Sequence, residues 1–589
     1  MSRRIDWALL ILVVTLLVCL GAWQHLSFSW RVGELAFFKN AYDEDSYVLF
    51  PYLLHTTRLD RALSTLLLHT IRTAAGGTFD AVFIVADTIL PAMAFLASYC
   101  LTSQLFRTIE MRVCWALLIV FAPDLLSLGS STSLTSAFFP LAWFRSLFGA
   151  LGETLVPPID TSYLNILRTF EPQLAYVVGF SFAALLIRFT FDKKTAPTRG
   201  GIAALAAVQC LLLTTYSLVG YPLILLELYA AIILLIVGSR RHALILMSLF
   251  GISLLIVTFA ASLTLKSQNF VFASRMPSIS TGTIGSVLLS SFILVVLWRR
   301  SFNDRALWLA LGFSGMPALL MNQQILTGLM VSTKDWERYI NHPLLAIGAA
   351  ILCSSFAATR SFGFVEDSHR IAAVIAAAAI LLFAFDSGRR TSAGWTSINV
   401  NSLAMARAID AASDQLTPHV VMVLADPSLA SLIAVRREGK RGFLIDYTDV
   451  FLDLIPTFDL TDFKITKHGI RMFTYWKLSG TSPADAEQLL QKEAATRAGY
   501  YSAFFFNICD YWYPCSDNRA VKTHLIEQLI GVVVGRYRQF LSDPADKMTA
   551  RYLLVTTEKD LGRFKSNFNP TPIASAAAGD VRAYVFGQK

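Results

Sequence analysis

The chain has 589 residues, of which 55% are hydrophobic and 15% are charged, and its mean hydropathy is +0.54. A soluble protein of this size does not need so much apolar surface, so the composition indicates a polytopic membrane protein. The net charge of +9 does not indicate a nucleic-acid partner, because no basic tract is interleaved with aromatic residues, and Lys and Arg in short cytoplasmic loops explain it.

The first apolar run extends from Trp7 to Trp23 and follows Arg3 and Arg4. It is long enough to span a bilayer and no small-residue cleavage site follows it, so we expect an uncleaved first helix with its N-terminus inside. Residues 24–78 are mixed in character and rich in aromatic residues, which favour the headgroup zone. Within them, residues 63–71 predict an amphipathic helix on the membrane surface.

Ten further apolar runs follow the first. They lie near residues 80–104, 113–129, 173–191, 202–219, 222–238, 242–263, 282–298, 306–321, 342–358 and 370–386. Alternation of eleven spans places fifteen basic residues in short inside loops and eleven in longer outside loops, a bias that supports this orientation. The stretch from Ser217 to Pro222 is either a very tight outer turn or a kink in one long helix, and a kink would invert everything downstream.

Charged residues return after Asp386. Strands are predicted at residues 419–426, 443–447, 552–556 and 581–586, and a helix at residues 484–496. The fold class is therefore a mostly α polytopic membrane protein of about eleven helices over residues 1–386, with a small extracytoplasmic α/β domain over residues 387–589. Cys509 and Cys515 lie in that domain and are expected to form a structural disulfide if it faces an oxidising compartment.

Three consecutive acids, Asp43, Glu44 and Asp45, follow the first helix. Successive helical residues turn by about 100°, so at most two of these carboxylates can share one site. They either complement the start of a helix, or they supply a general base whose neighbour binds a metal ion.

Other outer loops carry candidate cations and amides. Arg168 in the stretch that ends at Gln173 either clamps a phosphate or extends toward lipid headgroups. The stretch from Asn322 to Gly328 carries Gln323 and Gln324, and residues 337–339 follow; they face a cavity, or they are only a helix cap and a surface loop. The loop from Lys266 to Arg275 is a further place for a lipid phosphate. The chain has no Walker motif, so ATP is not expected as an energy source.

These features together resemble the GT-C glycosyltransferases, polytopic enzymes that take a sugar from a polyprenyl-phosphate carrier. Asp43 and Glu44, with Tyr47 shortly after, are similar to the Asp-Glu motif of the protein mannosyltransferase and aminoarabinose transferase branch. More closely, the membrane part resembles a bacterial group of GT-C-like proteins, which Asn322–Gly328 matches well and Arg168–Gln173 matches loosely. Glu171, before Pro172, departs from the expected pattern, which leaves its role open.

The resemblance implies an inverting transfer in which Asp43, or else Glu44 or Asp45, deprotonates an acceptor while polyprenyl phosphate leaves. Arg168, Arg275 and Arg338 would stabilise the phosphate, and a divalent cation, Mg or Mn, would sit on Asp43 and Asp45. The residues expected at the substrate are Tyr47, His55, Arg58, Glu171, Gln173, Gln323, Gln324, Glu337 and Tyr339. The protein would lie in a bacterial inner membrane with its N-terminus cytoplasmic, its C-terminal domain periplasmic, and the lipid bilayer, the lipid-linked sugar and an acceptor as partners.

Two other functions compete with the transferase. A transporter or flippase for a lipid-linked saccharide would use ionisable residues inside the spans, and Asp87, Asp124 and Glu227 are the acids there. A non-catalytic scaffold that binds an envelope-assembly protein would keep the fold without the chemistry. Substituting the acids at 43–45 separates these functions, because a scaffold tolerates the change and an enzyme does not.

Overall fold

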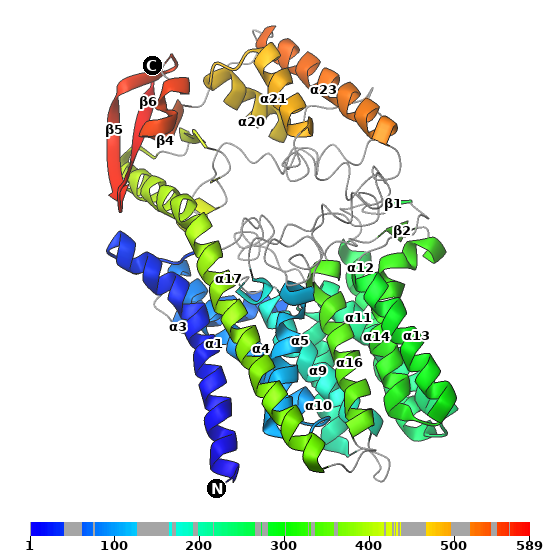
Figure 1. The fold of residues 1–589 in the computed structure, drawn as a ribbon. Helices are drawn as coiled ribbons and strands as arrows, with labels where there is room; N and C mark the ends of the chain where they lie inside the picture. Colours follow the sequence, from blue (N-terminus) through cyan, green and yellow to red (C-terminus); the bar gives the residue numbers. More distant parts are fainter. Residues whose placement is uncertain are drawn as a thin grey trace.

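The structure, a computed structural model, describes residues 2–39, 62–74, 77–126, 164–167, 172–191, 198–215, 217–264, 272–273, 281–300, 302–327, 329–330, 336–357, 363–416, 420–426, 429, 432–433, 436–437, 467–495, 519–542, 551–564 and 566–589. The described chain is mostly helical. A bundle of long helices carries a small sheet and three shorter helices beyond one of its ends (Figure 1). We call that end of the bundle the domain-proximal end; the N-terminus lies at the opposite end (Figure 1).

Each of the eleven apolar runs contains a helix. These helices are α1 (Ser2–Val32), α4 (Phe79–Thr102), α5 (Ile109–Leu126), α9 (Gln173–Phe191), α10 (Arg199–Leu213), α11 (Ser217–Ile236), α12 (Arg240–Thr264), α13 (Thr281–Arg300), α14 (Arg305–Thr327), α16 (His342–Ala357) and α17 (Gly363–Ala411). Among the described residues, seven of them are long and apolar enough to cross a membrane, namely α1, α4, α9, α11, α13, α16 and α17. The helical positions are confirmed, whereas eleven membrane crossings are not.

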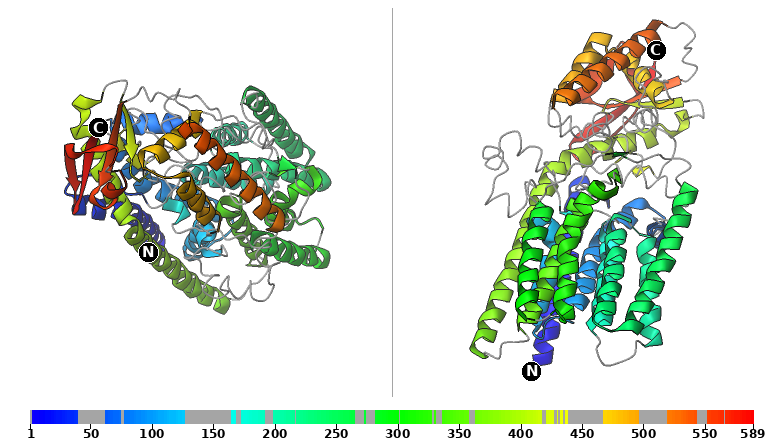
Figure 2. Two further views of the ribbon diagram at one scale, coloured as in Figure 1. Left: turned by 90° about the horizontal axis from the view of Figure 1, so that it is seen from above. Right: turned by 90° about the vertical axis from the view of Figure 1, so that its right-hand side faces the viewer.

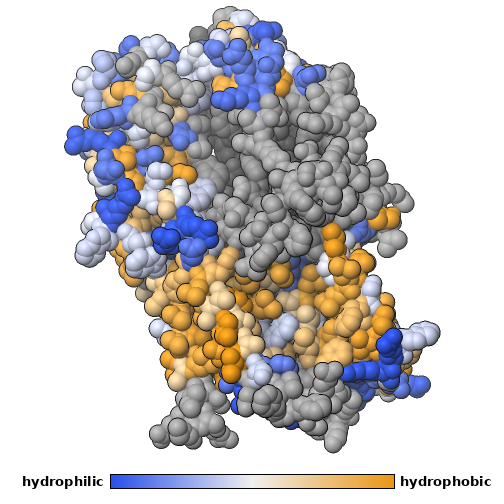
Figure 3. All heavy atoms as spheres, viewed as in Figure 1, coloured by the Kyte–Doolittle hydropathy of each residue, from blue (hydrophilic) through white to orange (hydrophobic). Residues whose placement is uncertain are grey.

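Large apolar side chains remain exposed around the bundle. Trp7, Leu255, Leu288 and Leu382 are each more than 60% exposed. Hydrophobic residues gather over the bundle and hydrophilic ones over the C-terminal part (Figure 3). An apolar surface of this extent is typical of helices that face lipid, and the distribution therefore favours a helical membrane protein.

The chain reverses direction between α10 and α11. A Cβ atom placed on Gly220 would lie 3.0 Å from the carbonyl oxygen of Leu212, eight residues earlier. Residues eight apart in one continuous helix are about 12 Å apart along its axis, so this contact requires a tight turn. The turn therefore lies between the end of α10 at Leu213 and the start of α11 at Ser217, a few residues earlier than expected, and residues 217–222 are the first turns of α11 rather than a turn or a kink.

Helix α17 is 49 residues long and continues from the bundle into the C-terminal part (Figures 1 and 2). At 1.5 Å per residue it is about 73 Å long, more than twice the thickness of a hydrocarbon core of about 30 Å. Asp386 pairs with Arg389 and Arg390, one turn along the same helix. The charges that mark the end of the apolar run thus lie inside α17, and the boundary expected between residues 386 and 387 falls within it.

The C-terminal sheet has the strand order β3-β4-β6-β5. Its strands are β3 (Val420–Leu424), β4 (Arg551–Thr557), β5 (Phe568–Ala578) and β6 (Val581–Gln588). β3 pairs parallel to β4, and the other two pairs are antiparallel. The predicted strands near residues 420, 552 and 581 are confirmed, and the one predicted at residues 443–447 lies outside the described residues.

Three helices accompany the sheet: α20 (Lys467–Leu478), α21 (Pro483–Ala495) and α23 (Arg519–Ser542). The predicted helix at residues 484–496 is α21. Phe473, Trp476, Tyr537 and Phe540 form an aromatic core between α20 and α23. Burial raises the pKa of Tyr537 to about 12. Its hydroxyl donates a hydrogen bond to the carbonyl oxygen of Thr481 at 2.8 Å.

The sheet shares one hydrophobic core with the end of α1. Phe28 and Phe38 from the N-terminal region are buried with Ala404 of α17 and with Leu553 and Val585 of the sheet. Burial of apolar side chains is the main stabilising contribution between such elements. The sheet is therefore packed directly onto the bundle at its domain-proximal end.

Candidate functional site

Several predicted site residues lie outside the described residues. They are Asp43, Glu44, Asp45, Tyr47, His55, Arg58, Arg168, Glu171, Arg275, Cys509 and Cys515. The structure describes residues on both sides of most of them, and these flanking residues show which parts of the bundle hold each segment.

The segment of residues 36–39, which leads to the three acids, is held by side chains of the bundle. The amide of Phe37 donates to Oδ1 of Asp80, at the start of α4, over 2.8 Å. The amide of Phe38 donates to Nδ1 of His25 in α1 over 2.9 Å. Buried backbone groups outside regular structure need such partners, so these side chains fix the path of the segment.

His25 and Asp87 form a buried pair, 0% and 1% exposed, with His25 Nε2 at 3.1 Å from Asp87 Oδ2. Because Nδ1 of His25 accepts from the amide of Phe38, the ring proton of the neutral imidazole lies on Nε2. Nε2 therefore donates to the carboxylate of Asp87.

Gln173 completes the surroundings of Asp87. Its Nε2 donates to Asp87 Oδ1 and to the carbonyl oxygen of Ile166, both over 2.9 Å, and its side chain is fully buried. A buried carboxylate is costly unless hydrogen bonds replace its hydration, and Asp87 has donors on both oxygens. The start of α9 is thereby tied to α1 and α4.

A second buried carboxylate holds the turn η2 (Asn165–Leu167). Oδ1 of Asp124, near the end of α5, accepts from the backbone amide of Asn165 at 2.9 Å and from its side-chain Nδ2 at 3.1 Å. Asp124 thus holds Asn165 directly, and Asp87 orients Gln173, which bonds the carbonyl oxygen of Ile166. This chain continues into Arg168.

The turn that contains Tyr339 joins the same end of the bundle through Tyr176, one turn after Gln173 in α9. Its hydroxyl donates to the carbonyl oxygen of Tyr339 at 2.5 Å, and both side chains are buried. Tyr339 lies in η3 (Glu337–Asn341), a π-helical turn that continues into α16. Single π-helical turns inside helices are frequent at functional sites.

A short two-stranded sheet brings two loops together. β1 (Phe272–Ala273) pairs antiparallel with β2 (Leu329–Met330). Arg275 follows β1 by two residues, and Arg338 lies in η3, which follows β2. The strands that precede Arg275 and Arg338 in the sequence are therefore adjacent in space.

The remaining predicted residues lie on α14, η3 and α9. Gln323 and Gln324 are in the last two turns of α14, and Gln323 is half-buried. The backbones of Glu337 and Arg338 are in η3. Gln173 and Tyr339 are buried among packed side chains, whereas the resemblance implies that they contact substrate.

Sequence reasoning missed His25 and Gln24, which follow Trp23 directly and belong to the same helix. Their signal is two polar side chains at the end of an apolar run, and both are at most 2% exposed. It also missed Asn165, whose carboxylate partner is 41 residues away.

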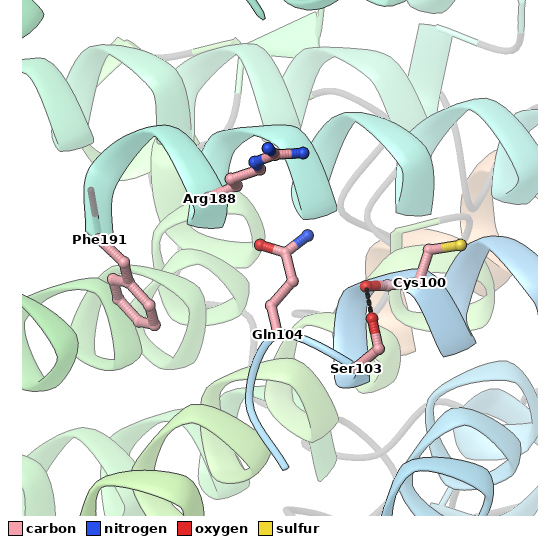
Figure 4. Close-up of a pocket in the computed structure, with 5 residues that line it drawn as sticks. All are labelled: Cys100, Ser103, Gln104, Arg188 and Phe191. Carbon is pink, nitrogen blue, oxygen red and sulfur yellow. Dashed lines mark hydrogen bonds between the residues drawn. The ribbon is translucent and has the colours of Figure 1, made fainter. Parts of the chain in front are cut away.

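A pocket of about 560 Å³ lies at the opposite end of the bundle, where α4 and α9 end (Figure 4). It is lined by Cys100, Ser103, Gln104, Arg188 and Phe191. The Ser103 hydroxyl donates to the carbonyl oxygen of Cys100, and Gln104 Nε2 donates to that of Ala184. None of the predicted site residues lines it, so it is not the candidate site.

Metal binding was predicted at Asp43 and Asp45, which lie outside the described residues. Within the described part of the chain, no three His, Cys, Asp or Glu side chains gather as metal ligands would.

Comparison with known protein families and with curated proteins finds no match to this chain.

Proposed function

We propose that this protein is a membrane glycosyltransferase that moves a sugar from a polyprenyl-phosphate donor to an acceptor. One observation carries the proposal: a series of contacts runs from Phe38 through His25, Asp87 and Gln173, and one turn further along α9 through Tyr176 to Tyr339. It connects the segment before the three acids with Gln173 and Tyr339. These two residues, both expected at the substrate and far apart in the sequence, lie at the same end of the bundle as that segment.

The chemistry assigns Asp43 as the general base. Asp43 takes the proton of an acceptor hydroxyl or amine as that group attacks the anomeric carbon. The bond from this carbon to the phosphate oxygen breaks, polyprenyl phosphate leaves with the electron pair, and the anomeric configuration inverts. Negative charge grows on the departing phosphate, and cations aimed at it lower the barrier.

Arg168, Arg275 and Arg338 are the residues proposed to bind that phosphate. Arg338 belongs to η3, Arg275 follows the paired strand β1 by two residues, and Asp124 holds η2 just before Arg168. A divalent cation on Asp43 and Asp45 would supply further positive charge beside the phosphate.

The test is turnover by the purified protein in lipid nanodiscs, with a panel of synthetic polyprenyl-phosphate hexoses and pentoses and a membrane extract as acceptor. Wild type is expected to release polyprenyl phosphate, and Asp43→Asn is expected to lose at least about 100-fold, as for removal of a general base. Glu110→Gln in α5, at the opposite end of the bundle, is the matched control and should retain activity. Equal release by wild type and by Asp43→Asn, Glu44→Gln and Asp45→Asn would contradict the proposal.

One observation favours the transporter instead. Glu227 in the middle of α11 is fully buried; its Oε2 accepts from Gln209 Nε2 at 2.5 Å, and its Oε1 has no hydrogen-bond partner among the described residues. Buried carboxyls inside spans are typical of transport pathways. Glu227→Gln should abolish movement of a lipid-linked saccharide across vesicles in a transporter and leave release of polyprenyl phosphate intact in a transferase. An envelope-assembly scaffold would tolerate both this change and the loss of the acids at 43–45.

A further inference from the structure

Two side chains from the C-terminal part of the chain hold the backbone of the segment before the three acids. Asn399, in the part of α17 beyond residue 386, accepts from the amide of Lys39 through Oδ1 at 3.0 Å and donates from Nδ2 to its carbonyl oxygen at 2.9 Å. This reciprocal pair occupies both backbone groups of Lys39, as a neighbouring strand would.

Arg436, which follows β3, holds the same segment two residues earlier. Its terminal NH2 nitrogen donates to the carbonyl oxygen of Phe37 at 3.1 Å and to Asn399 Oδ1 at 3.0 Å, and its Nε donates to Ser402 Oγ at 3.1 Å. The guanidinium lies 4.3 Å from the centre of the Phe37 ring and 4.0 Å from Asp80.

The Arg436 side chain is only 2% exposed. A buried arginine is costly without partners, and here its planar group matches several acceptors at fixed angles. Lysine could keep the charge but could not make these bonds together.

The hydrogen bonds from Asn399 and Arg436 hold residues that lie close to the acids along the chain. Lys39 precedes Asp43 by four residues, which span at most about 14 Å of extended chain. A displacement of residues 37–39 is therefore expected to displace the acids as well, because few rotatable bonds lie between them. Reacting groups displaced by about 1 Å can lose about 100-fold in rate.

We propose that Asn399 and Arg436 are positioning residues through which the C-terminal domain fixes residues 37–39, the segment that precedes the acids at 43–45. This inference rests on the proposed function and gives the C-terminal domain a part in it, because the domain holds the segment that leads to the proposed general base. Neither side chain needs to touch substrate.

The experiment combines hydrogen exchange with kinetics on the full-length protein. In Asn399→Ala and Arg436→Met, amides in peptides covering residues 34–39 should exchange faster than in wild type, while peptides from α9 stay unchanged. The kcat for release of polyprenyl phosphate should fall about 10- to 100-fold with donor KM within about threefold, because position and not binding is lost. Arg436→Lys should lie between wild type and Arg436→Met.

Arg437→Met is the matched control. Arg437 is adjacent and also buried, at 4% exposed, but its Nε pairs with Asp410 at 3.0 Å. The Arg437→Met variant should keep the wild-type hydrogen exchange of residues 34–39 and the wild-type kcat. If Arg436→Met does not fold, Asn399→Ala decides, since it removes no buried charge.

The two proposals fail in different ways. Unchanged exchange at residues 34–39 in both variants, or faster exchange with wild-type kcat, overturns the positioning role while the transferase stands. Absence of release by wild type from every donor overturns the transferase, and the catalytic role of the two residues with it.

Discussion

The Nε2 atom of His25 lies 3.1 Å from Oδ2 of Asp87, and Nδ1 of the same ring accepts from the amide of Phe38 at 2.9 Å. Because Nδ1 accepts the hydrogen bond from the Phe38 amide, the ring proton lies on Nε2, and Nε2 donates to the carboxylate of Asp87. This pair couples the first helix of the bundle to α4 and to the segment that leads to the acids.

Asp87→Asn should destabilise the protein although it changes only one atom of the side chain. The new amide would place an N–H₂ against either His25 Nε2–H or the Gln173 amide, which are both donors. We expect a loss of about 1–3 kcal/mol in the free energy of unfolding, the cost of an unsatisfied buried group, measured by denaturation in detergent micelles. Asp386→Asn, at an exposed acid of α17, should change it by less than about 0.5 kcal/mol. Equal stability of Asp87→Asn and wild type would contradict the tautomer assignment.

At the second carboxylate, the two partners should contribute unequally. Asn165→Ala removes one hydrogen bond to Asp124, worth about 1 kcal/mol, and keeps the backbone bond. Asp124→Ala removes both bonds and leaves a buried amide without an acceptor, so it should cost about 1–3 kcal/mol more. The double variant should be less destabilised than the sum of the two singles. Additive costs, or a larger cost for Asn165→Ala, would show that the two residues do not act as a pair.

Gly21 sets the distance between α1 and α4. A Cβ atom on Gly21 would lie 1.9 Å from the carbonyl oxygen of Asp87, so Gly21→Ala must separate the helices beside the His25 contact. Small residues allow such close approach of helices in membranes. We expect a loss of about 1–3 kcal/mol in denaturation experiments. Gly251→Ala in α12 has nothing within 4 Å of the new atom and should be neutral or stabilising, because alanine favours a helix more than glycine does. A similar loss in both variants would show that the cost at Gly21 does not come from its contact with Asp87.

Thiol counting tests the predicted disulfide. The chain has seven cysteines, and the five described ones, Cys19, Cys100, Cys114, Cys210 and Cys353, are free. Mass spectrometry after alkylation of the denatured, unreduced protein should find five labelled thiols, and seven after reduction. Seven labels without reductant would rule out a bond between Cys509 and Cys515 and would weaken the periplasmic placement of the domain.

Much of the helical part could be predicted, because the signal is local. The run at residues 173–191 coincides with α9, since apolar residues continue without interruption and Pro172 precedes the first turn. The end of α17 was missed for the same reason: Asp386, Arg389 and Arg390 interrupt the apolar run, although pairing one turn apart lets charged residues continue a helix. Strand β5 was missed because Pro570 and Pro572 are unusual in strands, but β5 lies at the edge of the sheet, where they are tolerated.

The candidate site could be predicted only in part. Asp87 was recognised as an acid inside a span, but its partner His25 is 62 residues away, and nothing local connects the two. Likewise, the contacts of Lys39 with Asn399 span 360 residues of sequence. Such pairs depend on tertiary packing, which a single sequence does not reveal.

The most direct test of the account is to locate the donor. A polyprenyl-phosphate sugar with a photoreactive diazirine on its sugar should label peptides at the domain-proximal end, from residues 24–50 and 164–176. Labelling confined to residues 100–104 and 188–191, around the pocket at the opposite end, would contradict the assignment of the site and the function built on it.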